Sequence, residues 1–249
     1  MPRGPPHNKT LGGIRYVVLI ESWHPVTKDL GLIKAPVATV VTEFTKWHGS
    51  LGIHYSTREV RSLKAAFECL PPLSAEKRRV LFLATNSDWT AFVQSGIDGS
   101  DPFPVMSQLS GQMGVLAMRV CATPKQAKWP AVMWEVYAPP SLGGQPPNNY
   151  RRSVAAANDG GRWVFSQSGA PYPFEDLSAY GRPKKRNRFT REMLEGYLRE
   201  FQLSPFVDHF YAVSPGRPAV MLERISRWGD VPPEFTLEEV IAGAPWRRK

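Results

Sequence analysis

Closely spaced pairs of strand-like segments, joined by turn residues, limit most strongly what this chain can fold into. Residues 79–85 and 89–94 are rich in β-branched and aromatic side chains and flank the three-residue turn Asn86-Ser87-Asp88. Residues 152–157 and 162–168 flank an Asn-Asp-Gly-Gly sequence that tolerates the positive φ angles of a tight hairpin. Because short turns join antiparallel neighbours only, the sequence predicts a largely antiparallel sheet.

Further segments carry strand or helix signals between and around these hairpins. Runs of β-branched and aromatic residues predict strands at 14–20, 115–122, 131–137 and 219–225. Apolar residues at helical spacing predict five helices, which start at Pro36, at the Ser56/Glu59 capping box, at Asp101-Pro102, after Thr190, and at the Thr236/Glu239 capping box. The second of these helices is expected to run to Leu70, ahead of Pro71 and Pro72.

The order of these elements predicts an α+β fold, with a largely antiparallel sheet and flanking helices, because strands come in adjacent runs rather than in alternation with helices. The 249 residues suit one domain, which we expect over 14–249, after a disordered leader at 1–13 that is rich in proline and glycine. The Pro/Gly-rich loop at 138–149 is a candidate sub-boundary within that domain.

Several protein classes are disfavoured by composition. The longest apolar runs hold only a handful of residues, whereas a membrane-spanning helix needs about 20. Residues 1–13 lack the apolar stretch of a secretory signal, so the expected location is the cytoplasm. Cys69 and Cys121 are too few for a disulfide framework or a four-thiolate zinc site, and both are expected to be small buried hydrophobes.

The formal net charge of +9 predicts attraction to a polyanion or an acidic protein. Six cations lie within ten residues that contain no acid: Arg182, Lys184, Lys185, Arg186, Arg188 and Arg191. Residues 247–249 form a second, terminal group of cations. The 182–191 run is interpreted either as a solvated loop or as an electrostatic contact surface.

Signals of catalysis or of cofactor binding are weak. The five histidines form no H-x3-H or H-E-x-x-H pair, and the chain has no P-loop and no G-x-S-x-G sequence, so neither metal nor cofactor is expected. Asp88, Asp98 and Asp101 are the only acids grouped near one another in the sequence in a way that suits acid–base or Mg²⁺ chemistry. Turn and helix-cap roles explain the same three residues.

Two tryptophans lie beside prolines in basic stretches. Trp129 belongs to Lys-Trp-Pro, and Trp246 to Pro-Trp-Arg. An exposed tryptophan next to cations can anchor a protein interface or stack on a nucleic-acid base. Packing against a loop is the alternative interpretation for each.

Two parts of the chain resemble a group of uncharacterised bacterial proteins. The first runs from Asn86 through Asp88-Trp89-Thr90-Ala91-Phe92 and continues with Gly96, Gly99 and Asp101-Pro102. The second comprises Arg188-Phe189-Thr190 through Tyr197, with Phe206-Val207-Asp208. The pattern is similar in style to immunity proteins of bacterial toxin–immunity systems, which implies an α+β scaffold without a catalytic signature. The resemblance carries no catalytic residues over to this chain.

Three functions follow as hypotheses. The first is a non-catalytic module that binds another protein, with a bacterial toxin as the expected partner, through the six cations of 182–191 together with Trp129 and Trp246. The second is nucleic-acid binding through 182–191. The third is an enzyme that uses Asp88, Asp98 and Asp101, which requires these carboxylates to meet in a cleft.

Overall fold

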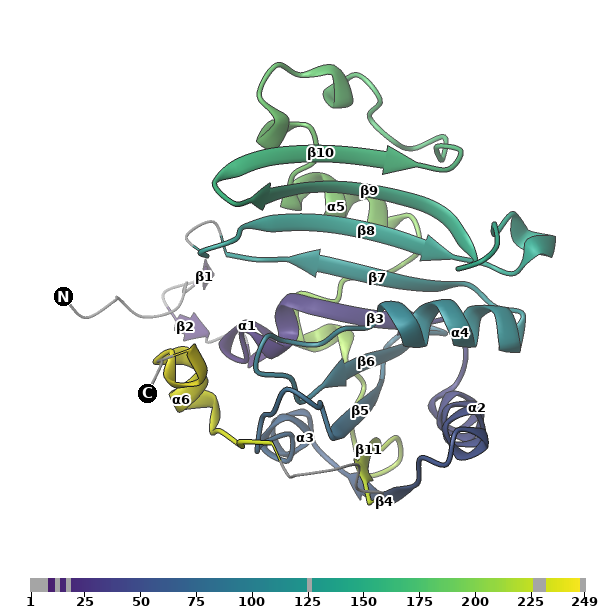
Figure 1. Cartoon of the computed structure of the whole chain (residues 1–249), viewed down its shortest axis with the longest axis vertical. Helices are drawn as coiled ribbons and strands as arrows, with labels where there is room; N and C mark the ends of the chain where they lie inside the picture. Colours follow the sequence, from purple (N-terminus) through teal and green to yellow (C-terminus); the bar gives the residue numbers. More distant parts are fainter. Residues whose placement is uncertain (1–8, 12–13, 17–18, 125–126, 226–231, 247–249) are drawn as a thin grey trace.

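Nine strands form one antiparallel sheet in the computed structural model, which describes residues 9–11, 14–16, 19–124, 127–225 and 232–246 (Figure 1). The strand order across the sheet is β10-β9-β8-β7-β3-β6-β5-β11-β4. These strands are β3 (Asp29–Ile33), β4 (Tyr55–Val60), β5 (Arg79–Ala84), β6 (Thr90–Gln94), β7 (Ala117–Ala122), β8 (Ala131–Tyr137), β9 (Tyr150–Asp159), β10 (Arg162–Ser168) and β11 (Ala219–Arg224). The predicted α+β fold with an antiparallel sheet is therefore confirmed.

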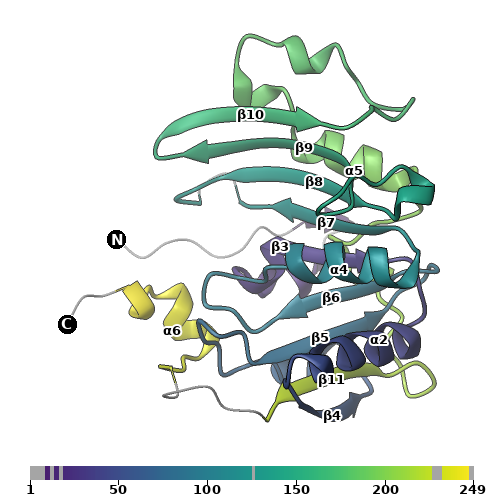
Figure 2. The same ribbon diagram turned by 45° about the vertical axis from the view of Figure 1, so that its right-hand side comes forward.

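Six α-helices accompany the sheet in the described part of the chain. They are α1 (Leu19–Ser22), α2 (Val37–Ser50), α3 (Leu63–Glu68), α4 (Phe103–Met113), α5 (Arg191–Arg199) and α6 (Leu237–Ile241). A separate two-stranded hairpin joins β1 (Lys9–Leu11) to β2 (Ile14–Tyr16). Figure 2 shows β10 and β4 at the two opposite edges of the sheet.

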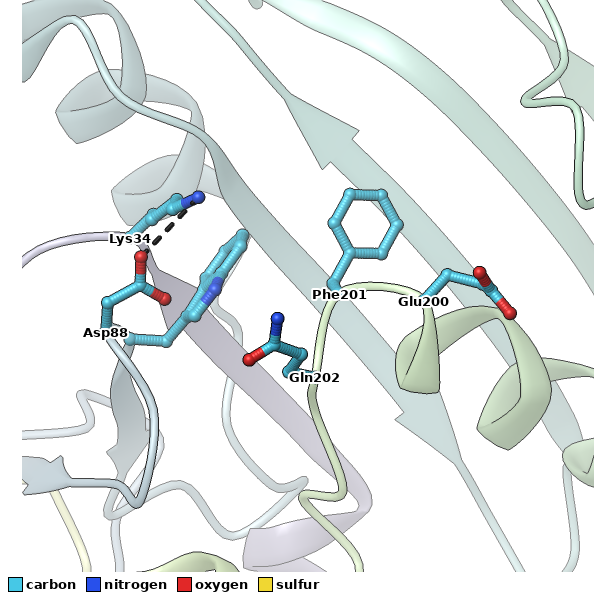
Figure 3. A pocket seen from close by; sticks show the side chains of 6 residues that line it. Lys34, Asp88, Glu200, Phe201 and Gln202 are labelled. Atoms are coloured by element: carbon cyan, nitrogen blue, oxygen red, sulfur yellow. Dashed lines mark ion pairs between the residues drawn. The ribbon is translucent and has the colours of Figure 1, made fainter.

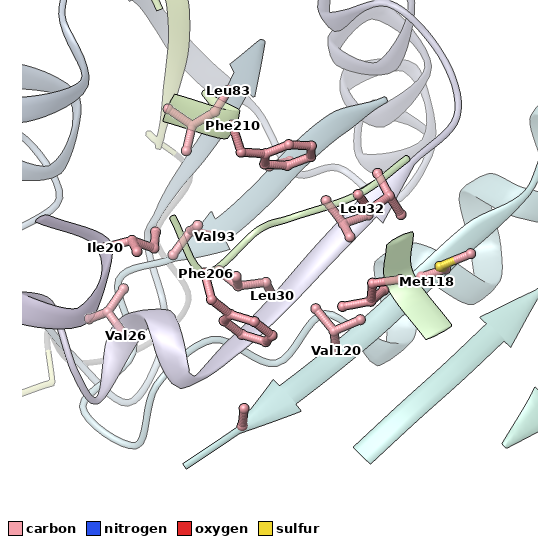
Figure 4. Close-up of a cluster of buried hydrophobic side chains, with 14 of the residues drawn as sticks. Ile20, Val26, Leu30, Leu32, Leu83, Val93, Met118, Val120, Phe206 and Phe210 are labelled. Atoms are coloured by element: carbon pink, nitrogen blue, oxygen red, sulfur yellow. The ribbon is translucent and has the colours of Figure 1, made fainter. Parts of the chain in front are cut away.

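Each face of the sheet has its own apolar core. On one face, which we call the α4 face, Phe44 of α2 and Met106 of α4 pack on Phe82 and Phe92. On the other, the α5 face, α3, α5 and α6 join a larger cluster that includes Trp134. Figure 4 shows part of that cluster, where Leu30 and Leu32 of β3 lie among Met118, Val120 and Phe206. Burial on both faces explains why all five residues of β3 are buried.

The hairpin between β9 and β10 is as tight as its sequence predicts. Asp159 pairs with Arg162 across Gly160 and Gly161, whose φ angles are +60° and +89°. Two consecutive positive φ angles define the turn that matches the twist of the flanking strands, and glycine adopts them without a steric cost. The side chain of Asn158 accepts a hydrogen bond from the Gly161 N–H at 2.8 Å.

The helix predicted from Ser56 to Leu70 is only partly correct. Its first part is strand β4, which pairs with β11 over six residues, and the helix α3 begins later, at Leu63. The cap is Ser62, whose hydroxyl accepts from the Ala65 N–H at 3.2 Å. Tyr55, Thr57 and Val60 suit a strand, and a partner that lies about 160 residues later in the chain selects that conformation.

The N-terminal predictions also need revision. The strand expected over 14–20 is shorter, because β2 ends at Tyr16 and helix α1 begins at Leu19. Within the expected leader, residues 9–11 form strand β1, and the rest of 1–13 lies outside the described residues. The loop at 138–149 connects β8 to β9, which are neighbours in the sheet.

Paired substitutions at Ser62 and Ser56 test the revised helix start. Ser62→Ala removes an N-cap and is expected to lower the free energy of unfolding by about 1 kcal/mol. Ser56→Ala, in the exposed strand β4, is expected to change it by less than about 0.5 kcal/mol. Urea unfolding of the two variants measures both values. Equal losses, or a larger loss at Ser56, would contradict the assignment of the cap to Ser62.

Candidate functional site

The basic segment, residues 182–191, lies against the edge of the sheet formed by β10, which we call the outer end of the sheet. Its short 3-10 helix η4 (Lys185–Asn187) packs on β9 and β10. The Arg188 guanidinium carbon lies 5.7 Å from the ring centre of Phe165 in β10, on the α5 face. Phe189 is buried against Tyr197 of α5. The segment is therefore docked on the sheet by its apolar and aromatic contacts.

Three of its six cations are used within the fold. Arg191 forms ion pairs with Glu21 at 2.7 Å and Glu195 at 2.9 Å. Arg182 lies 3.6 Å from an Asp176 oxygen, and Arg188 donates its Nε–H to the Arg182 carbonyl at 2.7 Å. Since these bonds join neighbouring parts of the segment to each other and to α1, they fix its shape rather than leave it free for a ligand.

The other three cations face solvent. Lys184 and Arg186 are exposed and Lys185 is half-buried. In the part of the chain that the structure describes, no salt bridge engages any of the three. Residues 150–191 contain nine cations and three acids and therefore carry a net charge of +6. The net charge of the whole chain is +9, so most of the positive excess lies in this stretch. This end of the molecule is strongly positive as a result.

A buried ion pair holds the segment in place. Arg152 of β9 and Glu175 are both almost fully buried, at 1% and 0% side-chain exposure. The Arg152 Nε–H donates to Glu175 at 2.9 Å, and its Nη1 donates to the carbonyls of Ser168 and Gly169 at 3.1 and 2.9 Å. Arg152 therefore ties the end of β10 to the loop that leads into the basic segment.

Tyrosines complete this network. The Tyr180 hydroxyl donates to Glu175 at 2.7 Å and lies 3.1 Å from the Tyr197 hydroxyl of α5. Burial, with the hydrogen bonds to Tyr197 and Glu175, raises the pKa of Tyr180. The hydroxyl consequently stays protonated and available as a donor. The Tyr172 N–H also donates to Glu175, at 2.7 Å, so the carboxylate accepts from three different residues.

Trp129 lies near the same end of the sheet. It sits in the turn between β7 and β8 with 51% of its surface exposed, and the Lys128 ammonium lies 5.3 Å from its ring centre. The next residue, Pro130, accepts a hydrogen bond from the Asn158 N–H, which places the turn beside the β9–β10 hairpin. Of the two interpretations left open for Trp129, the structure therefore favours an exposed aromatic group beside a cation over packing against a loop.

Trp246 is not brought to this surface. It is 54% exposed in the short helix η6 (Ala244–Trp246), which packs beside α6. Figures 1 and 2 both show α6 far from β10, below the sheet's centre. The predicted cations at 247–249 lie outside the described residues. Trp246 and Trp129 therefore do not form one surface.

The three candidate catalytic carboxylates do not converge. Asp88 precedes β6, whereas Asp98 and Asp101 follow it, so the length of that strand, about 15 Å, separates them. All three are exposed, and Asp88 pairs with Lys34 at 3.5 Å. Asp101 does not cap α4 through its side chain. The arrangement lacks the shared cleft that the enzyme hypothesis requires.

One cavity, of about 320 Å³, lies beside Asp88 (Figure 3). Six residues line it: Lys34, Asp88, Trp89, Glu200, Phe201 and Gln202. Its charged side chains are all exposed to solvent. Solvent screening of exposed charges leaves this cavity with weak electrostatic recognition.

A second buried ionic group lies beneath α4. Arg119 of β7 donates to Asp29 at 2.6 Å and lies 3.5 Å from a Glu135 oxygen, and the Tyr137 hydroxyl donates to Glu135 at 2.6 Å. Burial raises the pKa of Asp29 to about 6, although the hydrogen bonds from Arg119 act in the opposite direction. Burial disfavours the ionised carboxylate and so makes Asp29 readily protonated, and the nearby Glu135 charge adds a smaller effect in the same direction.

The described residues show neither a metal site nor a membrane-spanning helix. Within them, no three His, Cys, Asp or Glu side chains are grouped so that they could hold a metal ion. No described helix has the length and apolar character to cross a bilayer. Cys69 and Cys121 are both buried, as predicted, and burial raises the pKa of the Cys121 thiol to about 12.

Comparisons with known proteins identify no relative. No protein-family model, no curated protein and no solved structure matches this chain.

Sequence reasoning missed the Arg152–Glu175 pair. The available signal was the alternation in β9, because Arg152 shares the inward register of Val154 and Ala156. A charged residue in a row of inward-facing apolar positions calls for a buried partner. Nothing local to Arg152 identifies that partner as Glu175, 23 residues later in the chain.

Removing Arg152 tests how strongly the basic segment depends on the network. Arg152→Ala leaves the Glu175 carboxylate buried without its partner and is expected to lower the free energy of unfolding by about 3–5 kcal/mol. Arg182→Ala, which breaks the exposed pair with Asp176 and an exposed hydrogen bond to the Asn187 carbonyl, serves as control and is expected to cost about 1 kcal/mol or less. Urea unfolding gives both values, and similar losses in the two variants would contradict the central role of Arg152.

The raised pKa of Asp29 predicts a dependence of stability on pH. In the native state this carboxyl keeps its proton up to about pH 6, whereas an ordinary aspartate releases it near 3.8. The free energy of unfolding of the native sequence, relative to Asp29→Asn, should therefore fall as the pH rises from 4 to 7, by about 2–3 kcal/mol. Urea unfolding of both proteins at four pH values measures the difference. A constant or rising difference would show that Asp29 is ionised throughout.

Proposed function

We propose that this chain is a non-catalytic protein-binding module that holds its partner at the outer end of the sheet, around β10 and the basic segment. The observation that carries the proposal is that exposed Lys184 and Arg186 and half-buried Lys185, which form no salt bridge with any described residue, lie on a segment anchored by a buried ion pair. A charged surface that is ordered before binding loses little conformational entropy when the partner arrives.

Two further features favour a protein partner. Exposed Trp129, with Lys128 over its ring, lies toward the same end of the sheet, and tryptophan and arginine are the residues most enriched among interface hot spots. The α4 face of β10 carries Val164, Ser166 and Ser168, all exposed. These side chains give a mixed apolar and polar surface, which is the usual composition of a protein interface.

The identity of the partner follows only by analogy. The resemblance to immunity proteins of bacterial toxin systems makes a toxin the proposed partner, and the cytoplasm the proposed location. A toxin with an acidic surface would fit the excess of positive charge at this end of the sheet.

Nucleic-acid binding is the second candidate, because the same three cations would neutralise phosphates. This candidate predicts an apparent affinity for nucleic acid that falls steeply as the salt concentration rises and that requires no partner protein. The two candidates can therefore be separated by what the surface captures.

Site-specific photo-crosslinking in the host tests the proposal. A photoreactive amino acid at Val164 or at Arg186 is expected to yield a protein adduct that survives nuclease treatment. The same amino acid at Ser50, which is exposed at the end of α2, is the matched control and is expected to yield none. The triple variant Lys184→Glu/Lys185→Glu/Arg186→Glu should reduce the adduct at Val164 at least fivefold, since it reverses the charge of the surface.

Two outcomes would overturn the proposal. One is the absence of a protein adduct from both positions at the outer end of the sheet. The other is an adduct that nuclease treatment removes, which would establish the nucleic-acid alternative. Near-UV circular dichroism of the triple variant confirms that its fold is intact before the comparison is made.

A further inference from the structure

We infer that the free edge of β10 receives an extended, acidic segment of the partner as an additional strand of the sheet. The inference rests on the proposed function and assigns the mode of binding and the partner's chemistry. It depends on three features of the described residues: the direction of the main-chain groups of β10, the lack of protection along its edge, and the charge beside it.

The register of the β9–β10 hairpin determines which main-chain groups are free. Asp159 and Arg162 flank the two-residue turn and therefore form a hydrogen-bonded pair, so such pairs recur at every second residue of β10. The residues between them, Trp163, Phe165 and Gln167, direct their N–H and C=O groups away from β9. The Asn158 N–H confirms this alternation, because it donates to Pro130 on the opposite side of β9.

These outward groups find no strand partner within the described ranges. β10 ends the strand order of the sheet, and outside its ladder with β9 no backbone hydrogen bond of the described residues engages Trp163, Phe165 or Gln167. An unpaired row of donors and acceptors is a template for a further strand. A segment of about seven residues would match the length of β10.

The two edges of the sheet differ in protection. Edge strands usually avoid unwanted pairing through charged residues, prolines or short length. The opposite edge strand, β4, carries exposed Arg58 and Glu59 within its six residues. In β10, by contrast, the only charge is Arg162 at the start, and the remaining six residues contain neither charge nor proline. By its lack of charge and proline, the β10 edge is therefore the less protected of the two.

The charge near the edge selects the partner. The connection that carries Lys184, Lys185 and Arg186 lies beyond β10 in Figures 1 and 2, and η4 contacts β10 directly. A second copy of this chain would bring a second positive surface to the same place, and like charges would oppose that pairing. An acidic segment would instead be attracted.

Strand geometry also predicts the sequence pattern of that segment. Successive side chains of an added strand alternate between the two faces. Those on the α5 face would lie beside the cations of the basic segment, and those on the α4 face beside Val164 and Ser166. The expected pattern is an acidic residue at every second position, with small apolar or hydroxyl-bearing residues between.

A synthetic peptide provides the probe. It has seven residues that alternate glutamate with valine, blocked ends and a fluorescent label, and its binding is followed by anisotropy. Replacing its glutamates with lysines is expected to abolish binding, and N-methylation of alternate backbone nitrogens, on the side that faces β10, should weaken it about tenfold or more.

A matched pair of protein variants tests the edge itself. Gln167→Ala and Gln167→Pro both lose the side-chain hydrogen bond to Arg152, but only proline also removes the outward N–H. We expect Gln167→Pro to bind the peptide about three- to tenfold more weakly than Gln167→Ala. In the unaltered protein, hydrogen exchange of the Trp163, Phe165 and Gln167 amides should be fast and become at least tenfold slower when the peptide is added. This measurement needs no variant, so it keeps the test decisive even if Gln167→Pro fails to fold.

Three results would overturn the inference. The first is slow exchange of those three amides in the absence of peptide. Protection that increases with protein concentration would indicate pairing of two copies, and protection that is independent of concentration would indicate a partner within the chain; either would overturn the inference. The second is peptide binding that N-methylation and Gln167→Pro leave unchanged. The third is equal binding of the lysine peptide. If the crosslinks at Val164 and Arg186 persist in any of these cases, the proposed function stands and only the added strand is refuted.

Discussion

The Arg152–Glu175 ion pair is the interaction on which the outer end of the molecule depends. Two opposite charges with almost no solvent contact are tolerated only when each is paired and hydrogen-bonded. Here one guanidinium reaches β10 and the following loop, while one carboxylate accepts from Tyr172 and Tyr180. Strand, loop and helix α5 are therefore held to one another at a single point. The position of Lys184, Lys185 and Arg186 therefore depends on this ion pair.

Signals that act over a few residues were sufficient to predict most of the secondary structure. The two hairpins around 86–88 and 158–161 were predicted correctly, as were the Thr190 cap of α5 and the complete capping box of Thr236 and Glu239. The same reasoning failed for residues 56–60, where an equally good capping-box pattern lies in strand β4. Pairing with β11 outweighs a local preference of about 1 kcal/mol there.

The candidate site was predictable only in part. Charge clustering identified 182–191, but it did not show that Arg182, Arg188 and Arg191 serve the fold while Lys184, Lys185 and Arg186 face solvent. That division depends on acids such as Glu21, 170 residues away in the sequence. Grouping in sequence was equally misleading for Asp88, Asp98 and Asp101, because an intervening strand separates residues that are only 13 positions apart.

The position of β11 between β5 and β4 has a consequence for synthesis of the chain. Within the described residues β4 touches the sheet only through β11, so residues 55–60 have no neighbouring strand until residues 219–224 have left the ribosome. At typical elongation rates that delay lasts roughly 8 to 30 s. During this time the nascent polypeptide exposes the edge of β5 and an unpaired segment, both of which are substrates for chaperones.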